Sequence, residues 1–229
     1  MRKIFLSVFI IFISSSLYAQ TSIVGSLGMG GGVIFGSLNP NMKDLNVELK
    51  NAYLKEFEGG IFGFGGGGGL TLGNIRLGGY GIGGSKEVRT TVTGGEVISK
   101  LDFGYGLFVA GYELLKFGDL RFAIDVGIGG GSIDLNLINK NQGAVDWSNV
   151  FLPVSNSAKN LSMNFFYYQP SLVIEYIYGG FTKIFIAGDY SGIVNGKWKQ
   201  DGEFELLNVP DMKFNGFSIR AGIYLGIFL

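Results

Sequence analysis

Hydrophobic and polar residues alternate one by one along several long stretches of this chain. In residues 120–129, leucine, phenylalanine, isoleucine and valine occupy one set of alternate positions, while arginine, alanine, aspartate and glycine occupy the other. Alternate positions from Phe217 to Leu229 are likewise apolar, and most positions between them are small or polar, including Arg220. Successive side chains of a β-strand point to opposite faces, so this period of two residues predicts strands. The pattern predicts an all-β protein.

The alternation and the turn residues together predict eight strands, most of them longer than the about five to six residues usual in globular proteins. Their predicted bounds are 22–36, 58–72, 74–90, 97–116, 119–138, 161–178, 181–194 and 213–229. Tight turns at Gly73-Asn74, Phe117-Gly118-Asp119 and Gly179-Gly180 alternate with longer links at 37–57, 91–96, 139–160 and 195–212. An even strand number with short turns at one end and longer loops at the other is typical of bacterial outer-membrane barrels.

The first long link has a different periodicity. Leu45, Leu49, Ala52 and Tyr53 follow Asn39-Pro40 at near-helical spacing. This spacing predicts a short amphipathic helix between residues 41 and 57. Such a helix either caps the mouth of a barrel or lies on the lipid surface.

The N-terminus has the three parts of a secretory signal peptide. Arg2 and Lys3 are followed by an apolar run over 4–13 and by small residues that end at Ala19. This run is too short for a spanning helix, which needs about 20 apolar residues. We therefore predict a cleaved signal peptide at 1–19, export to the bacterial outer membrane, and a single β-barrel domain at 20–229.

Composition supports an ordered, glycine-rich β-structure. The chain has 40 glycines and 20 phenylalanines but only 4 prolines, and 47% of its residues are hydrophobic, which argues against disorder. Glycine inside a strand costs stability, so these glycines either permit the tight coiling of a small barrel or leave space in its lumen for water or a narrow ligand. Lys plus Arg and Asp plus Glu both number 18, without a basic stripe, which excludes nucleic acid as an expected partner.

If the apolar face of each strand points to lipid, the charged residues of the strands face the lumen. The predicted lumen charge network is Arg121, Asp125, Arg220, Asp102, Glu175, Lys183 and Asp189. Acids and bases are nearly balanced in this set, and enclosed charges must pair or be hydrated. A paired network that fills the barrel is therefore predicted, with a conducting lumen as the alternative.

Aromatic residues gather near the expected strand ends, as in the interfacial girdles of membrane barrels. The predicted interfacial aromatics are Phe165, Phe166, Tyr167 and Tyr168 at the outer end, and Tyr176, Tyr178 and Phe181 at the inner end.

The residues needed for common catalytic and metal chemistry are scarce. The chain contains no histidine and no cysteine, which removes the usual general base and the preferred ligands of zinc. Residues 79–84 match G-x-G-x-x-G literally, but the residues that follow do not predict the helix of a dinucleotide site. We therefore predict no catalytic residue, no cofactor and no metal.

Taken together, the alternating segments, the sorted links and the C-terminal Ile227-Phe228-Leu229 resemble those of small eight-stranded bacterial outer-membrane β-barrel proteins. The resemblance covers the whole predicted mature chain. It implies an antiparallel up-and-down transmembrane barrel that contacts outer-membrane lipid as a monomer. It also implies a structural or surface-binding, non-enzymatic role, with an extracellular partner at loops 139–160 and 195–212. Two alternatives are a narrow pore for small solutes and a secreted soluble barrel that binds an apolar ligand.

Overall fold

The computed structural model describes residues 27–93, 95–141, 158–209 and 214–229. The predicted signal peptide, the start of the first predicted strand and most of the link 139–160 lie outside these ranges.

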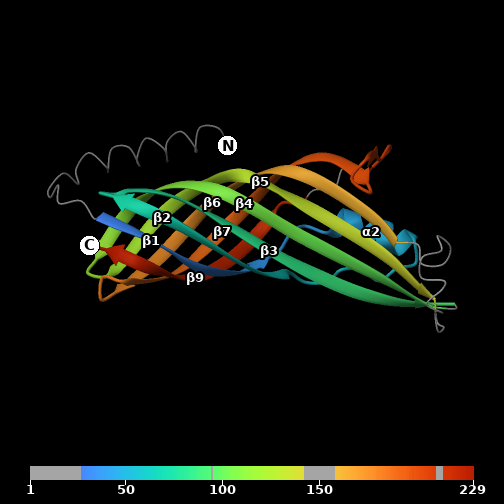
Figure 1. Ribbon diagram of the computed structural model, residues 1–229, viewed down its shortest axis with the longest axis horizontal. Helices are drawn as coiled ribbons and strands as arrows, with labels where there is room; N and C mark the ends of the chain where they lie inside the picture. The colour runs from blue at the N-terminus through green and yellow to red at the C-terminus, as the bar shows by residue number, and fades with distance from the viewer. Residues whose placement is uncertain (1–26, 94, 142–157, 210–213) are drawn as a thin grey trace, which may run out of the picture.

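Eight antiparallel strands form a closed ring (Figure 1). They are β1 Leu27–Leu38, β2 Ile61–Leu72, β3 Ile75–Val92, β4 Gly95–Phe117, β5 Leu120–Asn141, β6 Ala158–Tyr178, β7 Thr182–Gln200 and β9 Gly216–Phe228. Each strand pairs with the next along the chain, β9 pairs with both β7 and β1, and the two-residue β8, Phe204–Glu205, extends the far end of β7. The predicted all-β, eight-stranded antiparallel fold is confirmed.

Three tight turns lie at the end of the ring where β1 begins and β9 ends (Figure 1). Gly73, Gly118 and Gly179 occupy these turns with φ values of 63°, 60° and 61°. Only glycine adopts this left-handed conformation without a steric penalty, so these three residues permit the short reversals between long strands.

The helix α2, Lys43–Asn51, lies at the opposite end of the ring (Figure 1). Its residues Leu45 and Leu49 are buried in the same apolar cluster as inward-facing strand residues. Asn46 Nδ2 donates a hydrogen bond to Phe57 O, and Phe57 N donates one to Asn46 Oδ1, each 2.9 Å long. Of the two predicted positions for this helix, the structure therefore shows the one at the mouth of the barrel. No helix among the described residues is long and apolar enough to cross a membrane.

Two of the predicted longer links are shorter than expected. β3 continues to Val92 and β4 begins at Gly95, so the predicted link 91–96 is only a two-residue connection. β7 continues to Gln200, which removes the first part of the predicted link 195–212. These ends of β3, β4 and β7 resemble loops in sequence because their exposed residues are mostly polar, as loop residues are.

The two faces of the strands exchange polarity along the length of the strands. On β5, Val126 points outward and Asp125 points inward near the turns, whereas Asp134 points outward and Ile133 inward nearer the loops. We call the part of the ring level with residues 120–129 of β5 the turn half, and the part level with residues 130–141 the loop half. The turn half is apolar outside and charged inside, and the loop half of β3, β4 and β5 is mostly polar outside and apolar inside.

Candidate functional site

Charged side chains fill the lumen of the turn half. Six of the seven residues predicted for the lumen network point inward, and each is at most 7% exposed. They are Arg121, Asp125, Glu175, Lys183, Asp189 and Arg220. They lie at inward-facing positions of four neighbouring, hydrogen-bonded strands, β5, β6, β7 and β9.

Arg76 of β3 links these charges, although the sequence interpretation did not include it. Its Nη2 lies 2.7 Å from Glu175 Oε1 and 3.4 Å from Asp125 Oδ2. Lys183 Nζ lies 3.4 Å from the other oxygen of Glu175. The alternation Ile75-Arg76-Leu77 was a signal for an inward Arg76, but the glycines that follow made the facing of this strand ambiguous.

A second unpredicted residue, Glu113, pairs with Arg121, whose Nη1 lies 3.4 Å from Glu113 Oε2. The register of β4 against β5 shifts between Glu113 and Leu115. An irregularity of this kind hides the facing of a residue from a simple period-two pattern. Arg121 and Glu113 thus form an ion pair beside the group centred on Arg76.

Arg220 is held by a carboxylate and by two aromatic rings. Its Nε lies 3.0 Å and 3.2 Å from the two oxygens of Asp189. Its guanidinium carbon lies 4.5 Å from the ring centroid of Tyr80 and 5.6 Å from that of Phe185. Cation–π contacts and a charge-assisted hydrogen bond therefore offset much of the cost of burying this charge.

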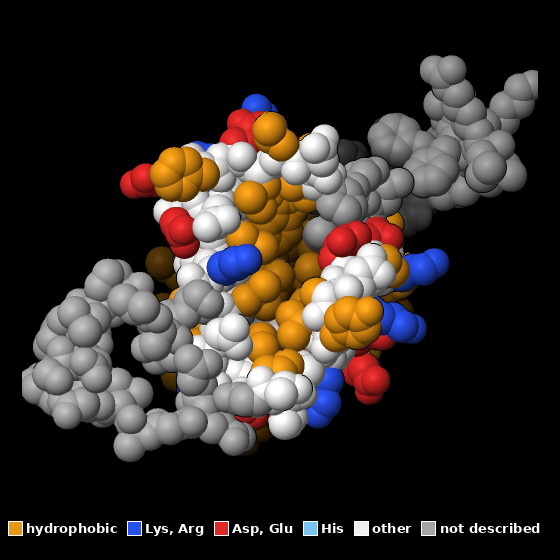
Figure 2. All heavy atoms as spheres, turned by 90° about the vertical axis from the view of Figure 1, so that its right-hand side faces the viewer, with side chains coloured by type: hydrophobic (Ala, Val, Ile, Leu, Met, Phe, Trp, Pro, Cys, Tyr) orange, Lys and Arg blue, Asp and Glu red, His pale blue; other side chains and the backbone are white. Residues whose placement is uncertain are grey.

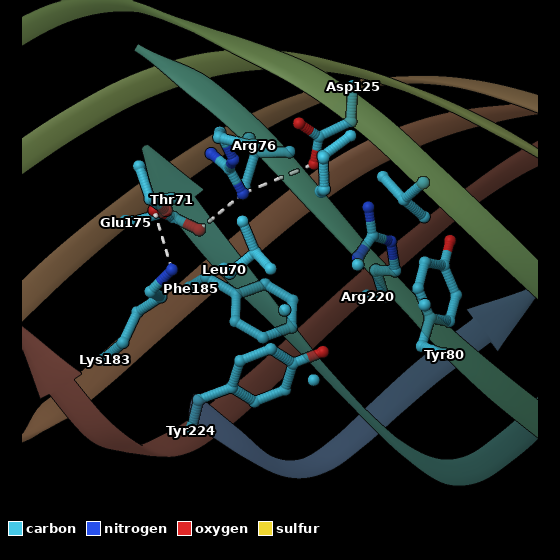
Figure 3. A pocket seen from close by; sticks show the side chains of 17 residues that line it. Leu70, Thr71, Arg76, Tyr80, Asp125, Glu175, Lys183, Phe185, Arg220 and Tyr224 are labelled. Carbon is cyan, nitrogen blue, oxygen red and sulfur yellow. Dashed lines mark hydrogen bonds and ion pairs between the residues drawn. The ribbon is translucent and has the colours of Figure 1, made fainter. Parts of the chain in front are cut away.

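A small cavity of about 60 Å³ lies among these charges (Figure 3). Its polar lining includes the heads of Arg76, Asp125, Glu175, Lys183 and Arg220. Three buried atoms of this lining have no hydrogen-bond partner among the described residues, namely Arg76 Nη1, Asp125 Oδ1 and Arg220 Nη2. A cavity of this size holds only a few waters or one small ion.

Stacked aromatic rings lie in the part of the loop half that is next to the charged cavity. The ring centroids of Tyr105 and Tyr167 are 4.4 Å apart, and those of Phe103 and Phe165 are 5.4 Å apart. The Tyr167 hydroxyl also forms a hydrogen bond with Ser191 Oγ. All four rings are buried inside the ring of strands and form an aromatic layer near its middle.

The prediction that seven aromatic residues form interfacial girdles is wrong for two of them. Phe165 and Tyr167 are buried inside the ring, because neighbours on a strand alternate between its faces and cannot all meet the interface. The other five are exposed on the outer wall: Phe166, Tyr168, Tyr176, Tyr178 and Phe181.

Asp102 also lies on the outer wall and not in the predicted lumen network. Its side chain is 34% exposed, and its Oδ1 forms an ion pair with Lys100 Nζ at 2.9 Å. The hydrogen bond that Lys100 donates to Asp102, together with the negative charge of that carboxylate, raises the pKa of the Lys100 ammonium. The prediction failed because it took the apolar face as outward everywhere, whereas in the loop half the apolar face of β4, with Leu101 and Phe103, points inward.

The loop half has an apolar interior that opens at the mouth. Seen from this end, hydrophobic side chains line a hollow inside the ring (Figure 2). A recess of about 200 Å³ lies at the mouth. Its lining residues are Leu54, Val97, Leu137, Asn139 and Lys159. The recess thus combines three aliphatic side chains with one amide and one ammonium group.

The described residues contain no group of three or more acidic side chains placed to hold a metal ion, and the chain has no histidine or cysteine to supply other ligands. The interior offers instead hydrogen bonding and ion pairing in the turn half and apolar contact in the loop half.

Comparison with known proteins identifies no family for this chain. No protein-family model matches the sequence, and no curated protein matches it. One solved structure with a similar arrangement is the outer membrane protease OmpT from Escherichia coli. It matches with a TM-score of 0.34 and 9% sequence identity, over 92% of this chain and 97% of that chain.

This finding contradicts the predicted structural or surface-binding, non-enzymatic role, because the matched protein is an enzyme. The predicted non-enzymatic role is therefore not carried further. A likeness at this TM-score and identity transfers no activity, substrate or catalytic residue to this chain.

Proposed function

We propose that this protein spans a bacterial outer membrane through its turn half and binds an amphiphilic molecule at the mouth of its projecting loop half. The observation that carries the proposal is the reversal of polarity along the same strands. Water on both sides of a membrane and lipid within it demand different outer walls, and the two halves of the ring have these two kinds of wall.

The outer wall of the turn half is too apolar for contact with water. Val126 is 55% exposed, Leu172 68% and Leu225 66%, on three different strands of the ring. Soluble monomers rarely expose contiguous apolar patches larger than a few hundred Å². A lipid environment accounts for an apolar wall that continues around the ring.

The strands are long enough to leave the membrane. β5 has 22 residues and thus extends for about 73 Å along its own axis. At a tilt of about 45°, it rises about 50 Å, roughly twice the 25 Å apolar band of an outer-membrane barrel. The loop half therefore projects into water, where its outward Asp102, Asp134 and Asn136 are hydrated.

The recess at the mouth has the chemistry of an amphiphile site. Leu54, Val97 and Leu137 offer apolar contact, and the ammonium of Lys159 lies at the same recess. A hydrocarbon chain gains from apolar contact, and an acidic head group gains from the ammonium. The recess lies on the loop side of the aromatic layer, so the ligand resides in the loop half. The described parts of the links 139–160 and 195–212, which we propose as the surface for an extracellular partner, lie at this end of the strands.

Single cysteines on β5 test the membrane position, because the natural chain contains none. In intact cells, we expect an impermeant maleimide to label Asp134→Cys and not Val126→Cys, although both side chains point outward on the same strand. After solubilisation in urea, both should react. Equal labelling of the two positions in intact cells would show a water-exposed barrel and contradict the membrane position.

Quenching of Trp198 tests the ligand site. Trp198 is buried in the loop half on β7 and becomes the only tryptophan after Trp147→Phe. We expect a brominated fatty acid to quench its fluorescence in a saturable manner in lipid nanodiscs. Leu137→Asp should weaken the apparent affinity by about tenfold or more, since a charge in the recess loses apolar contact and repels the carboxylate.

A brominated phospholipid, confined to the bilayer, is the control and should leave Trp198 unquenched. The ligand site would be contradicted if quenching rose linearly with the fatty-acid concentration and did so to the same extent in the Leu137→Asp variant. The cysteine labelling alone would then decide the membrane position.

A further inference from the structure

We propose that the cavity in the charged layer binds one small monovalent anion of the size of chloride. This site lies in the turn half, separate from the amphiphile recess, and its argument does not depend on that recess. It rests on the cavity itself and on the buried polar atoms that face it without partners.

The lining charges offer more hydrogen-bond donors than acceptors. Arg76 uses Nη2 for both Glu175 and Asp125, which leaves Nη1 without a partner. Arg220 uses Nε for Asp189, which leaves Nη2 without a partner. Lys183 contributes an ammonium with three N–H groups and one carboxylate contact. A ligand in the cavity must therefore accept hydrogen bonds.

The one unpartnered acceptor of this lining is turned toward the barrel wall. A Cβ atom added to Gly111 of β4 would lie 1.9 Å from Asp125 Oδ1, so this oxygen is packed against the backbone of that strand. Glu175 also lines the cavity, but Arg76 engages its Oε1 and Lys183 its Oε2. Three cationic heads against two carboxylates give the lining a net positive charge, which disfavours a cation.

The aromatic neighbours of Arg220 restrict how it can bind a ligand. Tyr80 and Phe185 lie against the guanidinium, so its remaining contacts are made by N–H groups in its plane. In-plane N–H groups form strong hydrogen bonds to anions, about twice as strong as those to a neutral acceptor such as water. The volume of about 60 Å³ admits a halide or a small carboxylate and excludes larger anions.

Bromide provides a direct test. Crystals of the membrane-extracted protein grown in bromide should show an anomalous difference peak between Arg76 and Arg220. A cavity that contains only ordered waters, with no bromide peak, would overturn the proposal. This test needs no variant and is independent of membrane labelling and of fatty-acid binding.

Thermal unfolding in detergent gives a second test and separates a bound ion from general salt effects. For a Kd on the order of 10 mM, about 100 mM chloride should raise the unfolding temperature by about 4 °C relative to gluconate at equal ionic strength. Arg76→Gln should abolish this difference between chloride and gluconate.

Arg121→Gln is the matched control. Arg121 lies in the same layer and is buried more deeply, with 5% of its side chain exposed against 14% for Arg76, but it pairs with Glu113 and does not line the cavity. The Arg121→Gln variant should unfold at a lower temperature and keep the full chloride response. An equal loss of the response in both variants, or no response in the natural protein, would contradict the anion site.

Discussion

Gly129→Ala will prevent the ring from closing, whereas Gly106→Ala will leave it folded. A Cβ atom on Gly129 would lie 2.0 Å from the carbonyl oxygen of Gly106 on the neighbouring strand. Because that oxygen belongs to the backbone of the strand pair, it cannot move without breaking the ladder. We expect a destabilisation of at least about 3 kcal/mol, at the upper end of the range for overpacking.

Gly106 is a close control because it lies on β4 opposite Gly130, one position along from Gly129. Its added Cβ would point outward and meet nothing nearer than Tyr80 O at 4.0 Å. Alanine there should be neutral or stabilise by about 0.5–1 kcal/mol through the unfolded chain. Folded fractions are measured by the change in gel migration on boiling. Equal folded fractions for the two variants would show that the inward glycines are not required for closure.

The geometry at Gly129 also distinguishes the two sequence interpretations of the glycines. Cβ atoms on the inward Gly32, Gly65 and Gly129 would all lie within about 2 Å of a backbone carbonyl oxygen and not in open space. These glycines permit close approach of strands in a narrow ring, as the first interpretation predicted. At the outward Gly83 and Gly104 the nearest atoms are 3.8 Å and 3.9 Å away, and no contact within the chain explains glycine there.

Arg220→Met will destabilise the barrel strongly, and a second substitution at its partner will restore most of the loss. Removal of the guanidinium leaves the Asp189 carboxylate buried without its cation, which costs about 3–5 kcal/mol. Arg220→Met combined with Asp189→Leu removes both charges and should recover most of the free energy of unfolding, since paired burial contributes little net stability.

The exposed pair Lys197–Glu205 is the matched control for this cycle. Lys197 Nζ lies 2.8 Å from Glu205 Oε1, but the side chain of Lys197 is 73% exposed. Lys197→Met should change the free energy of unfolding by less than about 1 kcal/mol, because water screens the pair. Urea titrations followed by gel migration measure all four proteins. If the double variant is no more stable than Arg220→Met, Asp189 is not the group left unpaired.

The strands and tight turns of this protein were predictable from local chemistry. Regular alternation in 120–129 and 217–229 reveals which side chains share a face, and Gly73, Gly118 and Gly179 mark reversals that need a left-handed residue. The charged face of β5, with Arg121 and Asp125, followed from the same pattern. These features depend on residues near one another in the chain, so the sequence contains the information directly.

The layering of the interior depends on the closed ring. A period of two residues identifies two faces but not which one points inward, and here the answer changes along a single strand. Asp102 was misplaced for this reason, and so were Phe165 and Tyr167. Arg76 and Glu175 are 99 positions apart in the chain and meet only because eight strands close around one lumen. The cavity between their charges therefore exists only in the assembled ring, where opposite strands bring their inward side chains together.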